Sequence, residues 1–554
     1  PGVDLLARLK GATGNPLFIK EYLHAIEDTP DAGDAGRVPP EFRLAVLRRL
    51  GQLSERANDV LRIASVLGST FSVSELTIAL RESAVELTPV LQEAFGRGVI
   101  AEVGESLAFR HDLVRQAIYD HMPLELRRQL HREVGRSLAA AKARPLVVAH
   151  HWGLGAAAPD AEAAEWLRRA ARDAAPSGPA VAVELLERAR DLLGEFSPDR
   201  DAVLAELVLA LAWSGRLVDA ESLALEILGR RADPTIAGTL RCGLVYALIW
   251  QGRYAEALRY TATAPGEELS ERDAVLLLAE AAHANLFVFD LPAASAQAAQ
   301  AAELAARLGH DLALCDALGV QAWTATMFGH PNRGVDFARR AIEIADRSAD
   351  GEPFLAHPRF FPGMPLCELD RLDEAEQVLQ TGRRRAEEMG LSWSLPLYHA
   401  HLGVRGFLAG DWDGAVAEIE AGLVIADEVG LHNIVMTASS AWLAVIQVHR
   451  DDLAGAEQIL AEASRHVMEM GGFTAVLFNW ARAILAEARG DVGEALGLLQ
   501  PAYEMSMATG QITDQWSAVA LVRLCLLTDD RARARVLLPL FDLHTTDGTA
   551  SMKG

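Results

Sequence analysis

Residues 407–416, FLAGDWDGAV, hold the feature that decides the fold: a helix ends at Gly410, and a small residue, Ala415, follows five positions later. Glycine adopts the positive φ of a helix end without a steric clash, and aspartate tolerates it better than most residues. The small side chain lets the next helix pack closely against the first. The same phrase recurs as AWSGRLVDAE (212–221), IWQGRYAEAL (249–258) and EARGDVGEAL (487–496). Each occurrence predicts two antiparallel helices joined by a short turn.

The phrase forms a repeat with a spacing of about 37 to 41 residues, slightly above the tetratricopeptide period. A single helix pair cannot bury its apolar face, so pairs stack into a superhelix whose inner surface forms a groove. We expect a tetratricopeptide-like α-solenoid over residues 201–543, a helical connector with a first repeat pair over 123–200, and a disordered tail over 544–554. The predicted turn and small residues are Gly215 with Ala220, Gly252 with Ala257, Asp290 with Ser295, Gly329 with Gly334, Asp370 with Ala375, Gly410 with Ala415, Asp451 with Ala456, Gly490 with Ala495, and Asp529 with Ala534.

The composition indicates a mainly α protein with more than one domain. The chain has 554 residues, of which 50% are hydrophobic and only 6% aromatic. Its formal net charge of −24 argues against a broad nucleic-acid surface, because phosphate contacts need clustered Lys and Arg. Any DNA contact is expected through a further C-terminal domain.

Four scattered cysteines and the lack of a long apolar run indicate a cytoplasmic protein without a membrane segment. The cysteines, at 242, 315, 367 and 525, have neither paired nor metal-like spacing. The sequence has no initiator Met and opens within a helical pattern, so we expect a fragment of a longer protein.

Six aromatic residues of the array are candidates for lining the groove: Trp323, Phe360, Phe361, Trp393, Trp442 and Trp480. Core packing is the alternative for each tryptophan, because helical arrays bury large aromatics. The two phenylalanines belong to HPRFFPGMPLC (357–367), whose three prolines interrupt the helical pattern. This segment is either a pocket-lining loop or a kinked first helix of its repeat.

Residues 38–122 read as a winged helix. Three helical patterns, one opening with Ser72 and Glu75 in capping-box spacing, precede VIAEV (99–103) and SLAFR (106–110), which form a predicted hairpin. The helical stretch before the hairpin, LTPVLQEAF, carries no Lys or Arg, so we expect a structural and regulatory role rather than DNA reading.

Five stretches carry a resemblance to a known family: GNPLFIKEY (14–22), VPPEFRLAVLRRLGQLSERANDVLRIASVLG (38–68), LAFRHDLVRQAIYD (107–120), AHHW (149–152) and AVELLERARDLL (182–193). With them the chain resembles the large ATP-binding regulators of the LuxR type, among the signal-transducing ATPases with numerous domains (STAND). The resemblance implies a P-loop ATPase, lid, winged helix, repeat array and C-terminal helix-turn-helix. No G-x-x-x-x-G-K-[ST] occurs here, and no basic helix pair follows the repeats. Residues 1–37 would thus be a lid remnant and linker, and this chain is not expected to be an enzyme.

The resemblance also implies four nucleotide-binding residues. Gly14 and Pro16 match the Gly-x-Pro motif that contacts adenine; a helix start at Asn15 is the alternative. His111 and Asp112 are similar to the Met-His-Asp motif of plant immune receptors, in which the His reaches the β-phosphate of ADP. Arg110 replaces the Met, and a helix-capping role for His111 and Asp112 is the alternative.

No catalytic or metal-binding residue is expected. Adjacent helical residues point about 100° apart, so His150 and His151 cannot easily share one ion. His121 and His131 are expected to be solvated or to cap helices.

The function expected from the resemblance is that of the sensor and regulatory portion of an ATP-dependent LuxR-type transcription regulator. ATP or ADP would bind the full-length protein, but no cofactor is expected for this chain alone. A small-molecule inducer or a partner protein would bind the array and favour an open, self-associating form. Two alternatives stay open: the regulatory region of a signalling enzyme (nucleotide cyclase or protein kinase), and a non-catalytic protein-binding scaffold.

Overall fold

The computed structural model describes residues 50–230, 234–262, 269–349, 351–429, 431, 434–467, 472–509 and 515–537. The chain divides into two compact units: the first comprises residues 1–173 and 188–197, and the second comprises 174–187 and 198–554. The predicted lid remnant, with Gly14 and Pro16, and the predicted tail lie outside the described residues.

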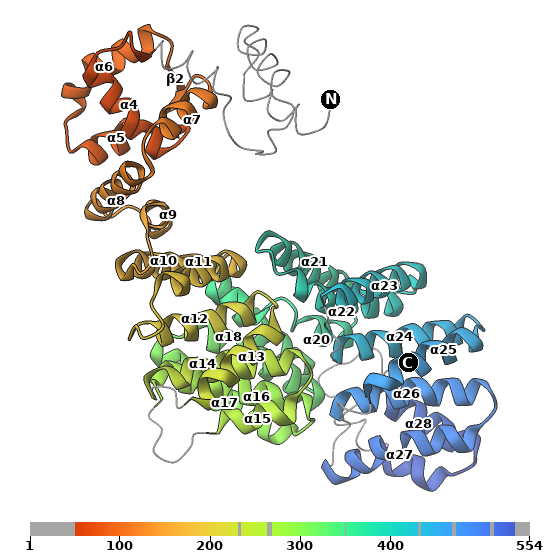
Figure 1. Ribbon diagram of the computed structural model, residues 1–554. Helices are drawn as coiled ribbons and strands as arrows, with labels where there is room; N and C mark the ends of the chain where they lie inside the picture. Colours follow the sequence, from red (N-terminus) through yellow and green to blue (C-terminus); the bar gives the residue numbers. More distant parts are fainter. Residues whose placement is uncertain are drawn as a thin grey trace. The chain divides into compact units, whose positions relative to one another are not determined.

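The first unit begins with helices around a small antiparallel sheet of order β1-β3-β2 (Figure 1). The predicted hairpin is confirmed: Val103 of β2 pairs with Ser106 of β3, and Gly104 turns the chain with a φ of +60°. The short strand β1 was not predicted. The elements are α4 (Glu55–Leu67), β1 (Thr70–Phe71), α5 (Val73–Leu80), α6 (Ala84–Gly96), β2 (Ile100–Val103), β3 (Ser106–Phe109) and α7 (Asp112–His121).

Reciprocal caps fix where two of these helices start. The Ser72 side chain accepts from the Glu75 backbone N–H, and the Glu75 carboxylate accepts from the Ser72 N–H, so the predicted capping box is confirmed. Ser83 and Glu86 form a second box at the start of α6. The apolar faces of these helices meet in one core with the sheet. The element order agrees with the winged-helix interpretation, which stays a prediction.

Four helices follow: α8 (Leu124–Ala140), α9 (Pro145–Gly155), α10 (Ala161–Ala174) and α11 (Pro179–Leu192). In the first unit, Trp152 of α9 is fully buried and packs with Val134 and Leu138 of α8. Gly135 lets this ring approach closely, because a Cβ there would lie 3.1 Å from the indole.

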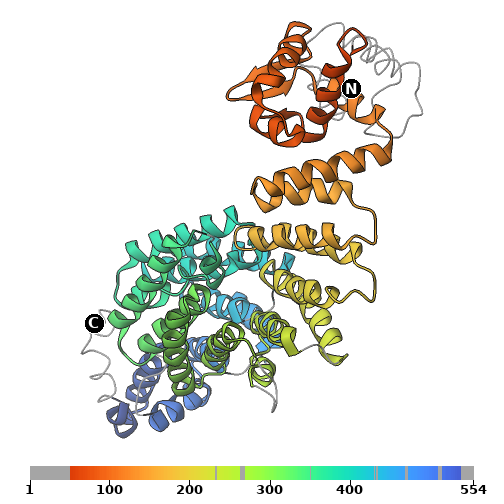
Figure 2. The same ribbon diagram turned by 90° about the vertical axis from the view of Figure 1, so that its left-hand side faces the viewer.

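The second unit is a series of antiparallel helix pairs, as predicted (Figures 1 and 2). The first helices of the pairs are α12 (Arg200–Trp213), α14 (Pro234–Trp250), α16 (Glu271–Phe287), α18 (Asp311–Met327), α20 (Gly363–Glu368), α22 (Leu395–Leu408), α24 (Ile434–His449), α26 (Gly472–Ala488) and α28 (Gln515–Leu527). The second helices are α13 (Leu217–Gly229), α15 (Tyr254–Thr261), α17 (Leu291–Leu308), α19 (Pro331–Arg347), α21 (Leu372–Glu388), α23 (Trp412–Glu428), α25 (Leu453–Val467) and α27 (Val492–Thr509), and residues 531–537 are also helical.

Eight of the nine predicted turn residues have a positive φ, between +56° and +85°. The prediction is wrong at the third turn, where Phe289 takes the φ of +70° and Asp290 has a φ of −85°. Asp290 instead caps α17, because its side chain accepts from the Ala293 N–H at 3.1 Å. The small buried residue of this repeat is therefore Ala294 rather than Ser295.

The predicted small residues of the other repeats are buried where the two helices of a pair meet. A Cβ on Gly334 would lie 2.7 Å from the Ala322 carbonyl oxygen of the preceding helix, so only glycine fits at that crossing. The close packing that the sequence predicted is thus confirmed.

One repeat lacks a full first helix. Between α19 and α20 the chain forms the 3-10 helix η1 (Glu352–Ala356) and a turn over residues 357–362. The prolines of this stretch prevent a continuous helix, and the first helix of the repeat is reduced to the short α20, which agrees in part with the kinked-helix interpretation.

Candidate functional site

The first helices of the last four repeats form an open groove of about 720 Å³. This size is typical of ligand pockets, which span roughly 300–1,000 Å³. Helices α22, α24, α26 and α28 each contribute side chains, so the groove runs along the first helices of consecutive pairs. The lining residues are Phe407, Val448, His449, Asp451, Trp480, Ile484, Glu487, Ala488, Trp516, Val519, Ala520 and Arg523.

Aromatic rings form the floor of this groove. Trp480 and Trp516 have ring centroids 5.8 Å apart, and both pack against Trp442, at 4.9 and 5.2 Å. Phe407 contacts Trp442 at 5.3 Å. Val519 extends the apolar floor and is 48% exposed. The groove can therefore bury apolar side chains of a ligand.

Charged groups stand at the side of the groove. Arg523 donates two hydrogen bonds to the carboxylate of Glu487, and the Nη2–Oε2 distance is 2.6 Å. The Arg523 side chain remains 49% exposed. Asp451 is exposed and lies at the turn after α24, with a φ of +65°. Two carboxylates against one guanidinium give the described lining a net negative charge.

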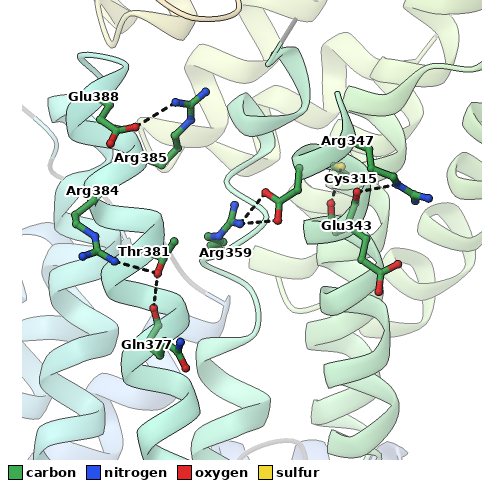
Figure 3. A network of polar contacts seen from close by, with 11 residues as sticks. Cys315, Glu343, Arg347, Arg359, Gln377, Thr381, Arg384, Arg385 and Glu388 are labelled. Atoms are coloured by element: carbon green, nitrogen blue, oxygen red, sulfur yellow. Dashed lines mark hydrogen bonds and ion pairs between the residues drawn. The ribbon is translucent and has the colours of Figure 1, made fainter. Parts of the chain in front are cut away.

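The inner face of the earlier repeats is filled by the segment from Gly351 to Pro362. Phe361 is 1% exposed and its carbonyl oxygen accepts from the Trp323 indole N–H at 3.0 Å. Arg359 anchors the segment, because its Nη2 donates to both carboxylate oxygens of Asp346, at 2.7 and 2.8 Å (Figure 3). Trp393 also belongs to this filled part, and its indole N–H donates to the Trp213 carbonyl at 3.0 Å.

The six aromatic candidates thus fall into two groups. Trp442 and Trp480 lie at the open groove, and Trp480 lines it. Trp323, Phe360, Phe361 and Trp393 lie in the filled part, each at most 5% exposed. A ligand role for these residues stays a prediction.

Sequence reasoning missed Phe407, His449, Val519 and Arg523 as groove residues. A signal for such positions exists: Trp480, Ile484 and Glu487 precede Gly490 by ten, six and three residues, and this spacing places them on one helical face. Counting back ten and six residues from Asp529 gives Val519 and Arg523.

The predicted nucleotide residues of the first unit lie at the start of α7. His111 is the N-cap residue in extended conformation, with no side-chain capping bond. Asp112 accepts hydrogen bonds from Arg115 Nε at 2.9 Å and Gln116 Nε2 at 2.7 Å. The capping alternative agrees with the N-cap position of His111 in the backbone alone, because its side chain makes no capping bond, and the nucleotide role stays a prediction.

His131 corrects the expectation of a solvated or capping histidine. It is 1% exposed, and its Nδ1 lies 3.0 Å from Nδ1 of His151, which is 2% exposed. Its Nε2 lies 2.8 Å from the Tyr119 hydroxyl. A neutral His131 that accepts from Tyr119 and donates to His151 satisfies this chain of contacts.

We expect the first unit to lose stability as the pH falls from about 6.5 toward 4. Burial lowers the pKa of His131 to about 4 and that of His151 to about 3, whereas unfolded histidine has a pKa of about 6.5. In that window the unfolded chain binds protons that the native state does not bind, which favours unfolding. Urea unfolding at pH 7.5 and 5.0, followed by pulse hydrogen exchange of peptides from α8 and α9, measures the change.

The test variant is His131→Leu. His121→Leu is its matched control, because His121 is exposed. The pH effect should shrink in the first variant and persist in the second. An equal pH effect in both would contradict a role for the buried pair.

Other chemistry is sparse in the part of the chain that the structure describes. The four cysteines are buried and form no disulfide there. No group of three or more His, Cys, Asp or Glu among the described residues could hold a metal ion. Within those same residues, no helix has both the length and the apolar character needed to cross a bilayer.

No protein-family model and no curated protein matches the chain. Among solved structures, it is similar to a STAND protein with a tetratricopeptide repeat sensor from Pyrococcus horikoshii, at 16% identity over 84% of this chain and 71% of that one, with a TM-score of 0.46. A Rap protein complexed with competence and sporulation factor is 13% identical over 61% of this chain and 99% of its own, with a TM-score of 0.41. The apo quorum sensor NprR from B. thuringiensis is 12% identical over 63% and 99%, with a TM-score of 0.39. These TM-scores lie below 0.5, so the likenesses support no argument of their own. The helix pairs of the structure itself make the chain a mainly α protein with a tetratricopeptide-like array.

Proposed function

We propose that the chain is the sensor and regulatory portion of an ATP-dependent LuxR-type regulator, and that the groove of its last repeats binds a short peptide segment. The segment is either a free inducer peptide or part of a partner protein. The groove on α22, α24, α26 and α28 carries this proposal.

The lining residues indicate which side chains the bound peptide would carry. An aromatic floor with the exposed Val519 favours apolar side chains, whereas Asp451 favours a basic residue beside it. The groove crosses several parallel-running first helices, and an extended peptide can contact each of them in turn.

The nucleotide part of the proposal rests on the resemblance of Gly14, Pro16, His111 and Asp112 to STAND motifs. In the full-length protein, ADP would hold a closed form and ATP with the ligand would favour an open one. The ligand shifts this balance only by its preference for the open form.

Val519→Asp should weaken peptide binding about tenfold or more, because it places a charge on the apolar floor. The measurement is fluorescence anisotropy of a labelled synthetic library of seven-residue peptides, each with two apolar residues and one lysine. Val519 is 48% exposed, so this change leaves the core intact.

Val424→Asp is the matched control, since Val424 is 58% exposed on α23, a second helix outside the groove. It should bind as the wild type does. Absence of binding by any peptide, or equal losses in the two variants, would reject the groove as a peptide site.

A further inference from the structure

A small, partly open cavity lies among the first helices of the earlier repeats, separate from the groove of the last repeats. The volume of this cavity is about 20 Å³, which is enough for one water-sized group. Its walls come from α12, α14, α16, α18 and η1. They consist of Trp213, Tyr246, Ile249, Trp250, Leu276, Glu280, His283, Leu312, Asp316, Leu355 and Ala356.

Three buried polar side chains meet in this apolar enclosure. Glu280 and His283 are each 4% exposed and lie one turn apart on α16. Asp316 of α18 is 7% exposed, and its Oδ1 lies 2.9 Å from Nδ1 of His283. Burying such groups is costly unless each polar atom has a partner.

Two of their atoms have no hydrogen-bond partner among the described residues: Glu280 Oε2 and His283 Nε2. With Nδ1–H donating to Asp316, a neutral His283 has an acceptor lone pair on Nε2. Glu280 is an acceptor when it is ionised, and a bound cation would favour that ionised form over the protonated one. The cavity therefore needs a guest that donates hydrogen bonds.

The charges around the cavity favour a cation. Burial, and then repulsion from the two acids Asp316 and Asp273, raise the pKa of Glu280 well above its usual range. A positive guest would offset this repulsion. Tyr246, Trp250 and Trp213 add aromatic rings, whose faces attract cations.

We propose that this cavity binds an ammonium ion or the head group of a primary ammonium compound. Such a group supplies three or more N–H donors and one positive charge in the volume of one heavy atom. Glu280, His283 Nε2 and Asp316 accept from it, and the Trp250 side forms the aromatic wall.

The first measurement is the thermal unfolding midpoint of the chain in 100 mM ammonium or methylammonium chloride, relative to equal concentrations of sodium chloride and tetramethylammonium chloride. Ligands that bind only the native state raise the midpoint. We expect a rise of about 2 °C with ammonium or methylammonium and no rise with tetramethylammonium, which has no N–H donor. A rise with ammonium alone would assign the site to the free ion.

Glu280→Gln keeps the size of the side chain and removes its charge, and it should abolish the rise. Glu303→Gln is the matched control, because Glu303 is exposed on α17, and it should retain the rise. A second readout is NMR of ¹⁵N-ammonium, which should give a slowly exchanging signal with the wild type and none with Glu280→Gln. Equal rises with tetramethylammonium, a retained rise in Glu280→Gln, or no bound ¹⁵N-ammonium signal would overturn the proposal, the last result indicating a water-filled cavity.

Discussion

Replacing Phe361 by alanine should destabilise the second unit by about 3 to 5 kcal/mol, the usual cost of emptying a buried phenylalanine site. The side chain is 1% exposed. Its ring lies against the backbone of α18, since a Cβ on Gly319 would come within 2.4 Å of it. Its centroid also lies 5.8 Å from those of Trp323 and His283. The surrounding helices are held in pairs and can collapse only partly into the space. Urea unfolding followed by tryptophan fluorescence measures the loss.

The matched control is Phe196→Ala, the same change at a side chain that is 95% exposed. It should shift the unfolding midpoint little. If both variants unfold at the same urea concentration, the segment from Gly351 to Pro362 does not fill a core.

Gly215→Ala should be more harmful than the same change at the turn residues Gly410 and Gly490. Gly215 has a φ of +85°, which costs a residue with a Cβ about 1 to 2 kcal/mol. In addition, its new Cβ would lie 2.6 Å from the Trp393 ring, closer than real contacts allow. The ring must move, and the Trp393 hydrogen bond to Trp213 would then break. We expect a loss beyond the backbone cost, measured by urea unfolding.

Gly490→Ala separates the two causes. Gly490 has the same φ of +85°, but a Cβ there would meet nothing within 4 Å. It should lose only the backbone cost of about 1 to 2 kcal/mol. Equal losses at the two positions would show that the Trp393 contact contributes nothing.

Local features of this fold were predictable because each depends on a few neighbouring residues. The glycine and aspartate turns, the Ser72–Glu75 box and the hairpin at Gly104 all follow from backbone preference and short-range hydrogen bonds. The prediction of a positive φ at Asp290 was wrong because aspartate suits both a positive φ and an N-cap position. The local sequence does not distinguish the two. Strand β1 has two residues, too few to show an alternating pattern.

Contacts between distant residues were not predictable from periodicity. His131 and His151 lie on consecutive helices, and their meeting depends on how those helices cross. In the sequence, the cavity acids Glu280 and Asp316 look like the acids of ordinary polar helix faces. Nothing in the local pattern shows that they are buried. Trp480 was found as a groove candidate because it is aromatic, whereas Val519 and Arg523 required knowledge of which helices line the inner face.

The hydrogen bond between Trp393 and Trp213 joins residues that are 180 positions apart in the sequence. In a simple repeat array every unit touches only its neighbours, so folding can start anywhere and spread along the chain. This one contact raises the contact order of the stretch from α12 to α22, which slows folding, because a long loop must close before the contact forms. The stretch should consequently gain its structure late and as one cooperative block.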